Sequence, residues 1–180
     1  EVSVIPIRAD ARSLPFDLSF FDAIVSIDSF FYYGTDDLYL NYIARFLKPG
    51  GLLGIAGAGL MQEFDSSIPK HLSDWWTQDL WGLHSAGWWR RYWARTGILD
   101  IEIADTLSDG WRYWRDWLKV VAAENLQEIK TVEEDAGRYL GYVRVAGRRR
   151  GDTPLMDPVD SFPSRYTKKP LLRSGNNTPE

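Results

Sequence analysis

Two apolar runs and an amphipathic segment between them occupy residues 21–56, FDAIVSIDSFFYYGTDDLYLNYIARFLKPGGLLGIA. The first run, 21–27, shows no alternation of apolar and polar residues, which is typical of a parallel strand buried on both faces. From Leu40 to Leu47 apolar residues recur at intervals of three and four, which predicts a helix with one apolar face. The KPGG sequence ends that helix, and 52–56 is predicted to be the next strand. A strand, a helix and a strand at this spacing predict a right-handed parallel crossover.

Further elements are predicted on both sides of this unit. A strand at 2–7 comes before it. After it come a helix capped by Ser85 and closed by Gly97, an alternating strand at 99–103, one long helix at 108–130 and a last strand at 139–148. The two late strands indicate an antiparallel addition at the edge of the sheet. The predicted fold class is therefore α/β, a Rossmann-like, doubly wound and mostly parallel sheet.

One domain is expected over residues 1–150, because 180 residues suffice for a single core and are too few for two. Within it, 61–84 has no clear periodicity and contains three tryptophans, which predicts a lid or an insertion. Residues 151–180 hold five of the nine prolines and show no periodicity. That composition predicts a disordered tail.

The composition excludes several classes of partner. A net charge of −4 argues against a broad basic surface for nucleic acid. Residues 148–150 form the only run of three basic residues, and we expect a solvated strand end there rather than a phosphate site. The longest apolar runs fall short of the roughly 20 residues that a membrane span needs. Since the chain also lacks cysteine, we expect a cytoplasmic protein that binds neither nucleic acid nor a membrane.

Three short motifs follow one another in the N-terminal part of the chain. They are Asp10-Ala11 with Leu14-Pro15-Phe16, then FDAIV at 21–25, then LKPGG at 47–51. In this order and at this spacing they resemble class I S-adenosylmethionine-dependent methyltransferases of the small-molecule type. The resemblance extends to residue 150. It implies a seven-stranded sheet whose last strand lies antiparallel between its neighbours, S-adenosylmethionine as cofactor, and methyl transfer to a small-molecule acceptor.

Relative to that family, the chain is expected to be truncated at its N-terminus. It would begin at the family's third strand, without the first strand and the glycine-rich turn that meets the methionine part of the cofactor. The glycines from Gly54 to Gly59 run along a predicted strand, and close approach of neighbouring strands explains them better than a displaced cofactor loop. Whether these 180 residues are active alone stays open.

The cofactor-binding residues that the resemblance implies follow the first two predicted strands. Asp10 would accept a hydrogen bond from the adenine amino group, and the Ala11 amide would meet a ring nitrogen; alternatively, Asp10 caps the turn before Leu14. Asp28 and Ser29 end the next strand at the same edge, where open α/β sheets bind ligands, and would lie beside the cofactor. Asp28 would also take a proton from the acceptor, or it simply ends the strand.

An aromatic run follows at 30–33. Aromatic rings beside a sulfonium attract its positive charge and exclude water from the methyl group. Phe30 and Phe31 are expected to pack under the next helix, whereas the hydroxyl groups of Tyr32 and Tyr33 need hydrogen-bond partners. Tyr32 and Tyr33 are therefore candidate catalytic residues together with Asp28. Relatives can carry a histidine in this stretch, and this sequence has none.

Within and just after the predicted lid, Trp75, Trp81 and His84 are candidates for contact with the acceptor. The tryptophans at 88, 89, 93, 111, 114 and 117 occur at helical spacing, which predicts that they belong to the core. No metal site is predicted, because the spacing of His71, His84 and the nearby carboxylates matches no ligand pattern.

Two other classes of function stay open. The first is an inactive remnant that acts as an interaction module through an exposed sheet edge. The second is another Rossmann-like enzyme, such as a nicotinamide-dependent one, which requires a Gly-x-Gly-x-x-Gly turn after its first strand. The sequence identifies neither the acceptor nor the oligomeric state.

Overall fold

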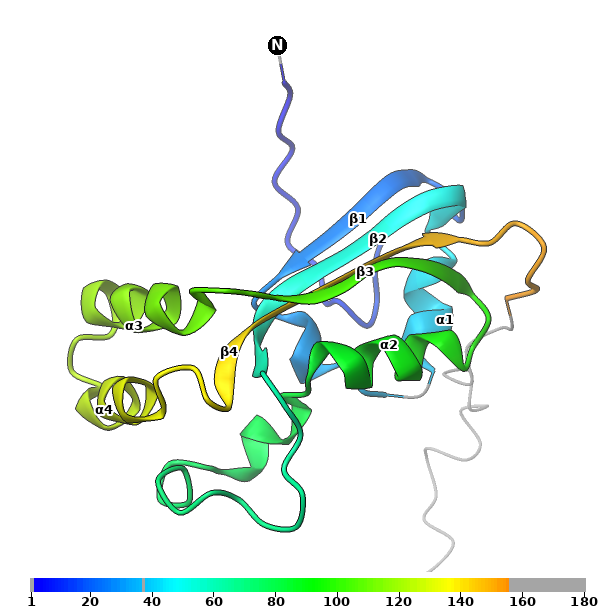
Figure 1. Cartoon of the computed structure of the whole chain (residues 1–180). Coiled ribbons are helices and arrows are strands. Elements are labelled where there is room, and N and C mark those ends of the chain that lie inside the picture. Colours follow the sequence, from blue (N-terminus) through cyan, green and yellow to red (C-terminus); the bar gives the residue numbers. More distant parts are fainter. Residues whose placement is uncertain (1, 37, 156–180) are drawn as a thin grey trace, which may run out of the picture.

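A mixed sheet of four strands forms the centre of the protein (Figure 1). The computed structural model describes residues 2–36 and 38–155. The strands are β1 (Phe21–Ile27), β2 (Leu47–Leu60), β3 (Leu99–Leu107) and β4 (Leu140–Arg149), in the order β1-β2-β4-β3. β1 is parallel to β2, while β4 is antiparallel to both β2 and β3. The predicted parallel pairing of two strands joined through a helix and the antiparallel addition are confirmed, although β4 lies one place in from the edge strand β3.

Helices lie on one face of the sheet and at one end of it (Figure 1). α1 (Tyr39–Ala44) and α2 (Ala86–Ala94) lie along the face, and α3 (Gly110–Val121) and α4 (Leu126–Asp135) lie at the end where β3 leaves the sheet. Since β1, β2 and β3 run in the same direction, this end is their carboxyl edge. Two short 3-10 helices, η1 (Phe30–Tyr32) after β1 and η2 (Gln78–Gly82), contact each other. No helix within residues 2–36 and 38–155 is long and apolar enough to cross a membrane.

Large side chains fill the space between the sheet and helices α1 and α2. Trp89 and Trp93 are 1% and 0% exposed and lie on one side of α2. Leu40 of α1 and Leu53 of β2 belong to the same cluster. The helix begins where the sequence predicts, because the Ser85 side chain caps it by accepting a hydrogen bond from the backbone N of its first turn.

A second apolar cluster lies at the carboxyl edge. Its buried members come from β2, segment 61–84, α3, α4 and β4: Leu60, Leu72, Leu83, Trp114, Leu118, Ile129, Val132 and Leu140. Segment 61–84 is also tied to α4, since His71 Nε2 lies 2.8 Å from Oδ1 of the fully buried Asp135. The segment is therefore packed against the domain, and its role as a lid stays a prediction.

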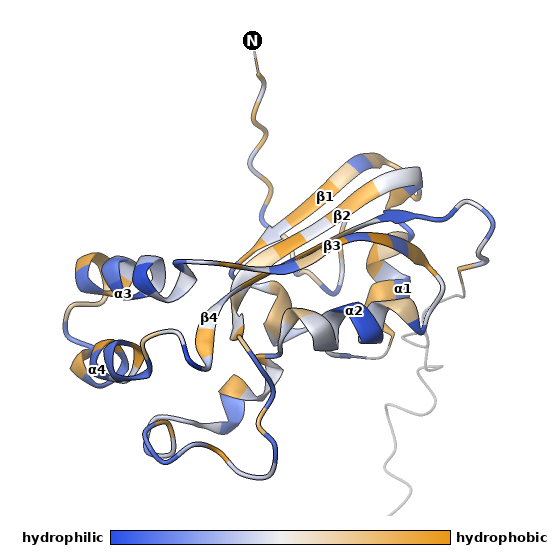
Figure 2. Cartoon of the chain, in the orientation of Figure 1, coloured by the Kyte–Doolittle hydropathy of each residue, from blue (hydrophilic) through white to orange (hydrophobic). Residues whose placement is uncertain are grey.

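Two predictions about the N-terminal part are wrong. Residues 2–9 form no strand, and Val2 and Val4 are 90% and 81% exposed. Within the described part of the chain no strand lies beside this segment, so its backbone groups have no ladder to join. β1 was expected to be covered on both faces, but it is an edge strand on which Val25 is 65% exposed. Hydrophobic residues predominate along β1 and β2 (Figure 2), and α1 and α2 cover only one side of them.

The single long helix predicted at 108–130 is also wrong, because the structure divides it into α3 and α4. Asn125 accounts for the division. Its Oδ1 accepts a hydrogen bond from Glu128 N at 3.3 Å, and its Nδ2 donates to Glu128 Oε2 at 2.6 Å. The Asn125 side chain therefore caps the first turn of a new helix.

The second predicted strand is longer than 52–56. β2 begins at Leu47, and its first residues stay beside β1 through an irregularity of the register between Phe21 and Ala23. At its other end β2 continues to Leu60, which pairs with Leu140 of β4. The antiparallel partner therefore extends the strand beyond the part that β1 covers.

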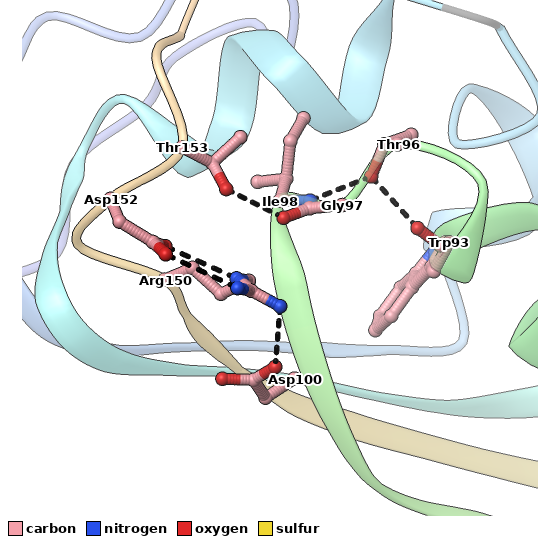
Figure 3. A network of polar contacts seen from close by, with 8 residues as sticks. All are labelled: Trp93, Thr96, Gly97, Ile98, Asp100, Arg150, Asp152 and Thr153. Atoms are coloured by element: carbon pink, nitrogen blue, oxygen red, sulfur yellow. Dashed lines mark hydrogen bonds and ion pairs between the residues drawn. The ribbon is translucent and has the colours of Figure 1, made fainter.

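The residues after β4 contact the turn between α2 and β3 (Figure 3). Arg150 lies between Asp152 and Asp100, with N–O distances of 3.1 and 3.3 Å. Thr153 Oγ1 donates to Gly97 O at 2.8 Å. The start of the predicted tail therefore has defined partners, and residues 156–180 lie outside the described part.

Candidate active site

The end of β1 places Asp28 at the carboxyl edge of the sheet. Asp28 has a φ angle of 53°, a left-handed conformation that aspartate adopts more readily than most residues. Its backbone N donates to Ala56 O at 2.9 Å, which holds it against β2. A Cβ atom on Gly57 would lie 3.3 Å from Asp28 Cα, so glycine permits this approach. Strained backbone at the ligand-binding edge of an open α/β sheet is typical of functional residues.

Tyr142, near the start of β4, is the partner of the Asp28 side chain. The two side chains line the same cavity, and burial together with the charge of Asp28 raises the pKa of Tyr142 well above its usual value. The phenol therefore stays protonated at neutral pH and is a donor available to the carboxylate. Sequence reasoning missed Tyr142. The sequence signal that was available is the alternation of side chains along β4, which places Tyr142 on the opposite face from the buried Val143.

Asp28 lies in the wall of a cavity of about 190 Å³, which we call the aromatic pocket. Its rings are those of Phe31, Tyr32, Trp114, Trp117 and Tyr142, and its other lining residues are Ala58, Leu80, Leu83, Asp28 and Glu128. The structure thus brings together the predicted residues Asp28 and Tyr32. Sequence reasoning missed the residues of α3 and α4, because the turn between these helices is what brings them to the end of β1.

Glu128 supplies the second carboxylate of the aromatic pocket. Trp114 Nε1 donates to its Oε1 at 3.2 Å, and Asn125 Nδ2 donates to its Oε2 at 2.6 Å. Burial raises the pKa of Glu128 above its usual value, against the lowering effect of these two hydrogen bonds. The carboxylate is therefore held in place by neutral donors in a poorly solvated position.

A second cavity, of about 320 Å³, is lined by His84 and Trp81, and we call it the His84 pocket. His84 Nδ1 lies 3.2 Å from Glu63 Oε2, and the imidazole stacks on Trp88 at a centroid distance of 3.7 Å. Burial opposes ionisation of Glu63, but hydrogen bonds from Ser85 and His84 prevail and lower its pKa. An ionised Glu63 favours the His84 tautomer with its proton on Nδ1, which leaves Nε2 as a hydrogen-bond acceptor.

A third hollow, of about 520 Å³, joins these two regions. It shares Phe31 and Tyr32 with the aromatic pocket and Trp81 with the His84 pocket. The predicted residues Asp28, Tyr32, Trp81 and His84 therefore line adjoining hollows.

Three other predicted residues line none of these hollows. The hydroxyl groups of Ser29 and Tyr33 are 3.1 Å apart, and Ser26 Oγ lies 2.9 Å from Ser29 Oγ. Trp75 packs edge-on against Trp114 in the second cluster. In this structure Ser29 and Tyr33 thus support the end of β1, and Trp75 is a packing residue.

Asp10 and Ala11 lie in an exposed turn that is anchored to α1. Asp10 Oδ1 accepts a hydrogen bond from Arg12 N at 2.8 Å, so the turn-capping alternative is present in the structure. The Tyr39 hydroxyl donates to Ala11 O at 3.0 Å, and burial raises the pKa of Tyr39. The adenine contact of Asp10 and Ala11 stays a prediction.

The remaining tryptophans divide between core and cavity. Trp89, Trp93 and Trp114 are buried, as predicted. Trp117 was expected in the core but is 58% exposed, because α3 turns Trp114 and Leu118 toward the second cluster and leaves Trp117 at the rim of the aromatic pocket. Among residues 2–36 and 38–155, no group of three or more His, Asp or Glu side chains is placed to hold a metal ion.

Comparison with known sequences points to one kind of domain. Residues 2–55 match the family model of a methyltransferase domain. A segment of 65 residues is 32% identical to the sterol 24-C-methyltransferase of Schizosaccharomyces pombe, and it covers 36% of this chain and 17% of that protein.

Solved structures share the fold. Phosphoethanolamine N-methyltransferase 2 of Haemonchus contortus superposes with a TM-score of 0.58 at 18% identity, over 78% of this chain and 36% of that one. Geranyl diphosphate C-methyltransferase of Streptomyces coelicolor gives 0.57 at 21% identity, over 78% of this chain and 50% of that one. The chain thus spans half or less of the length of these proteins. Residues 2–55 are thus similar to a methyltransferase domain, and the chain shares its fold with solved methyltransferases.

Proposed function

We propose that the protein binds S-adenosylmethionine and transfers its methyl group to a small-molecule acceptor in the hollows around Asp28, Tyr32 and His84. The position of Asp28 carries the proposal: a carboxylate with a strained backbone, beside Tyr142 in the wall of an aromatic pocket at the carboxyl edge of the sheet. The names of the similar proteins, which refer to phosphoethanolamine, geranyl diphosphate and a sterol, support a small-molecule acceptor.

Residues of the turn at Asp10 and of the end of β1 would hold one side of this cofactor. The exposed Asp10 carboxylate and the Ala11 amide would hold the adenine, and Asp28 and Ser29 would lie along the rest of it. Because Tyr39 fixes the Ala11 carbonyl, the turn has its shape before a ligand binds. S-adenosylmethionine supplies a methyl group on a positively charged sulfur, which is a good leaving group.

The side chains around the hollows would position the acceptor and handle its proton. Asp28 would take the proton that an oxygen or nitrogen acceptor loses, while the Tyr142 hydroxyl holds the carboxylate in orientation. The ring of Tyr32 would exclude water. Tyr33 acts through its contact with Ser29 as a positioning residue. On the acceptor side, Trp81 would provide a ring surface, and His84 Nε2 would accept a hydrogen bond.

Isothermal titration calorimetry with S-adenosylhomocysteine tests the proposal on the 180-residue chain. We expect binding to the wild type, about tenfold weaker binding to Asp10→Ala through loss of one hydrogen bond to a charged group, and no change for Asp17→Ala, an exposed loop aspartate. Absence of both heat and a thermal shift with the wild type would overturn the proposal and favour an interaction module without cofactor.

A cytoplasmic location is part of the same proposal and rests on the absence of cysteine. Fractionation of cells expressing a tagged chain tests it. We expect the chain in the cytosolic fraction, and recovery from a secreted or organelle fraction would contradict it.

A further inference from the structure

We propose that the aromatic pocket binds an organic ammonium group, and that the methyl acceptor is therefore an amine, which gives a proton to Asp28 before its nitrogen takes the methyl group. The link to the acceptor rests on the proposed function above. The preference of the pocket for a cation is a property of its lining and is tested separately.

The rings enclose the aromatic pocket from three elements. Phe31 and Tyr32 of η1 have their centroids 4.1 Å apart, and Trp114 of α3 meets Tyr142 of β4 edge-on at 6.3 Å. Trp117, one turn along α3, closes the rim. The faces of such rings carry negative electrostatic potential, and cages of this kind hold methylated ammonium groups.

The polar lining of the pocket is anionic and has no basic partner. Asp28 and Glu128 are its two carboxylates, and no lysine, arginine or histidine of the described residues lines it. The hydrogen-bond partners of Glu128, Trp114 and Asn125, are both neutral. A half-buried carboxylate without a cation is costly, which agrees with the raised pKa of Glu128. A bound cation would remove that cost.

Several carboxylates elsewhere in the described structure have cationic partners. Asp105 pairs with Arg144 at 2.7 Å, and Glu133, on the same helix as Glu128, pairs with Lys119 at 2.6 Å. The aromatic pocket thus differs from these surface positions, because its lining provides negative charge and ring faces without the counter-charge.

The size and position of the pocket favour an acceptor amine over the cofactor sulfonium. Its volume, about 190 Å³, is below the roughly 300–1,000 Å³ of cavities for drug-sized ligands, so it suits a small ammonium group. Of the residues proposed to contact the cofactor, only Asp28 lines it, whereas Asp10, Ala11 and Ser29 do not.

Calorimetry with choline and its neutral carbon isostere, 3,3-dimethylbutan-1-ol, measures the preference for charge at constant shape. We expect choline to bind about tenfold tighter than the alcohol. Glu128→Gln should weaken choline binding about fivefold or more and leave the alcohol unchanged, while Glu133→Gln, the matched exposed carboxylate of α4, should change neither. Trp117→Leu provides a second variant, since this exposed ring can be removed without opening the core. It should also weaken choline binding.

Titrations with the cofactor pair distinguish the two sources of positive charge. If the pocket belongs to the acceptor, choline binds equally well with or without saturating S-adenosylhomocysteine, and S-adenosylmethionine does not displace it. Equal affinity for choline and the alcohol would overturn the inference, as would displacement by S-adenosylmethionine and not by S-adenosylhomocysteine. Binding of S-adenosylhomocysteine without any preference for choline would refute the ammonium site alone. A preference for choline without any binding of S-adenosylhomocysteine would refute the proposed function and retain an ammonium site.

Discussion

The buried carboxylate of Asp135 provides a sharp test of how segment 61–84 is held to the domain. Asp135 is 0% exposed, and its Oδ2 accepts hydrogen bonds from the backbone N of Tyr139 at 2.9 Å and of Leu140 at 2.8 Å. Its Oδ1 lies 2.8 Å from His71 Nε2. Asp135→Ala leaves these groups without a partner, and each unsatisfied buried group costs about 1–3 kcal/mol. We therefore expect a loss of about 3–5 kcal/mol in the free energy of unfolding.

Two matched variants separate this effect from a general disturbance of α4. Asp135→Asn should cost about 1 kcal/mol, because the amide can turn its oxygen to the two backbone donors and its NH₂ group to the imidazole. Glu134→Ala, at the exposed neighbouring position, should change stability by about 0.5 kcal/mol or less. Urea unfolding followed by tryptophan fluorescence measures all three. A cost of Asp135→Ala equal to that of Glu134→Ala would refute the reasoning.

Two further predictions concern packing and pH. Gly59→Ala should lower the free energy of unfolding, measured in urea, by about 1–3 kcal/mol. The added Cβ would lie 2.7 Å from Val143 Cγ1 and 2.8 Å from His84 O. Gly54→Ala, on the same strand, should be close to neutral, because a Cβ there meets nothing within 4 Å. A similar cost for both would contradict the described packing of β2. Because the pKa of Glu63 is lowered from 4.5 in the folded state, its contribution is present above that value and is lost as the pH falls through the folded pKa. The melting temperature of the wild type should therefore fall more steeply on acidification than that of Glu63→Gln, and parallel curves would contradict this.

The elements predicted correctly are those that local pattern determines. The spacing from Leu40 to Leu47 and the cap at Ser85 are local features, and a helix forms at both places. The first helix is shorter than predicted, because α1 ends at Ala44 and the KPGG sequence belongs to β2 rather than ending the helix. The division at Asn125 was also available locally, because an asparagine followed three residues later by a glutamate is a signal for a helix start. The exposure of Val25 on β1 could not be predicted locally, because an apolar run does not reveal which of its faces another element covers.

The candidate site was predictable only at its strand ends. Asp28 follows from the rule that the carboxyl ends of parallel strands form the ligand edge. Tyr142 and Glu128 reach the same pocket through the antiparallel return of β4 and the turn between α3 and α4, which are tertiary features. Trp117 shows the same limit, because helical spacing does not distinguish the side of a helix that meets the core from the rim beside it.

Ultraviolet cross-linking of S-adenosylmethionine labelled in its methyl group, followed by peptide mapping, tests the central claim most directly. We predict a label that excess S-adenosylhomocysteine abolishes, located in peptides that contain Asp10 and the stretch from Asp28 to Tyr33. No competable label, or a competable label confined to peptides outside these two, would contradict the assignment of the carboxyl edge as the site of methyl transfer.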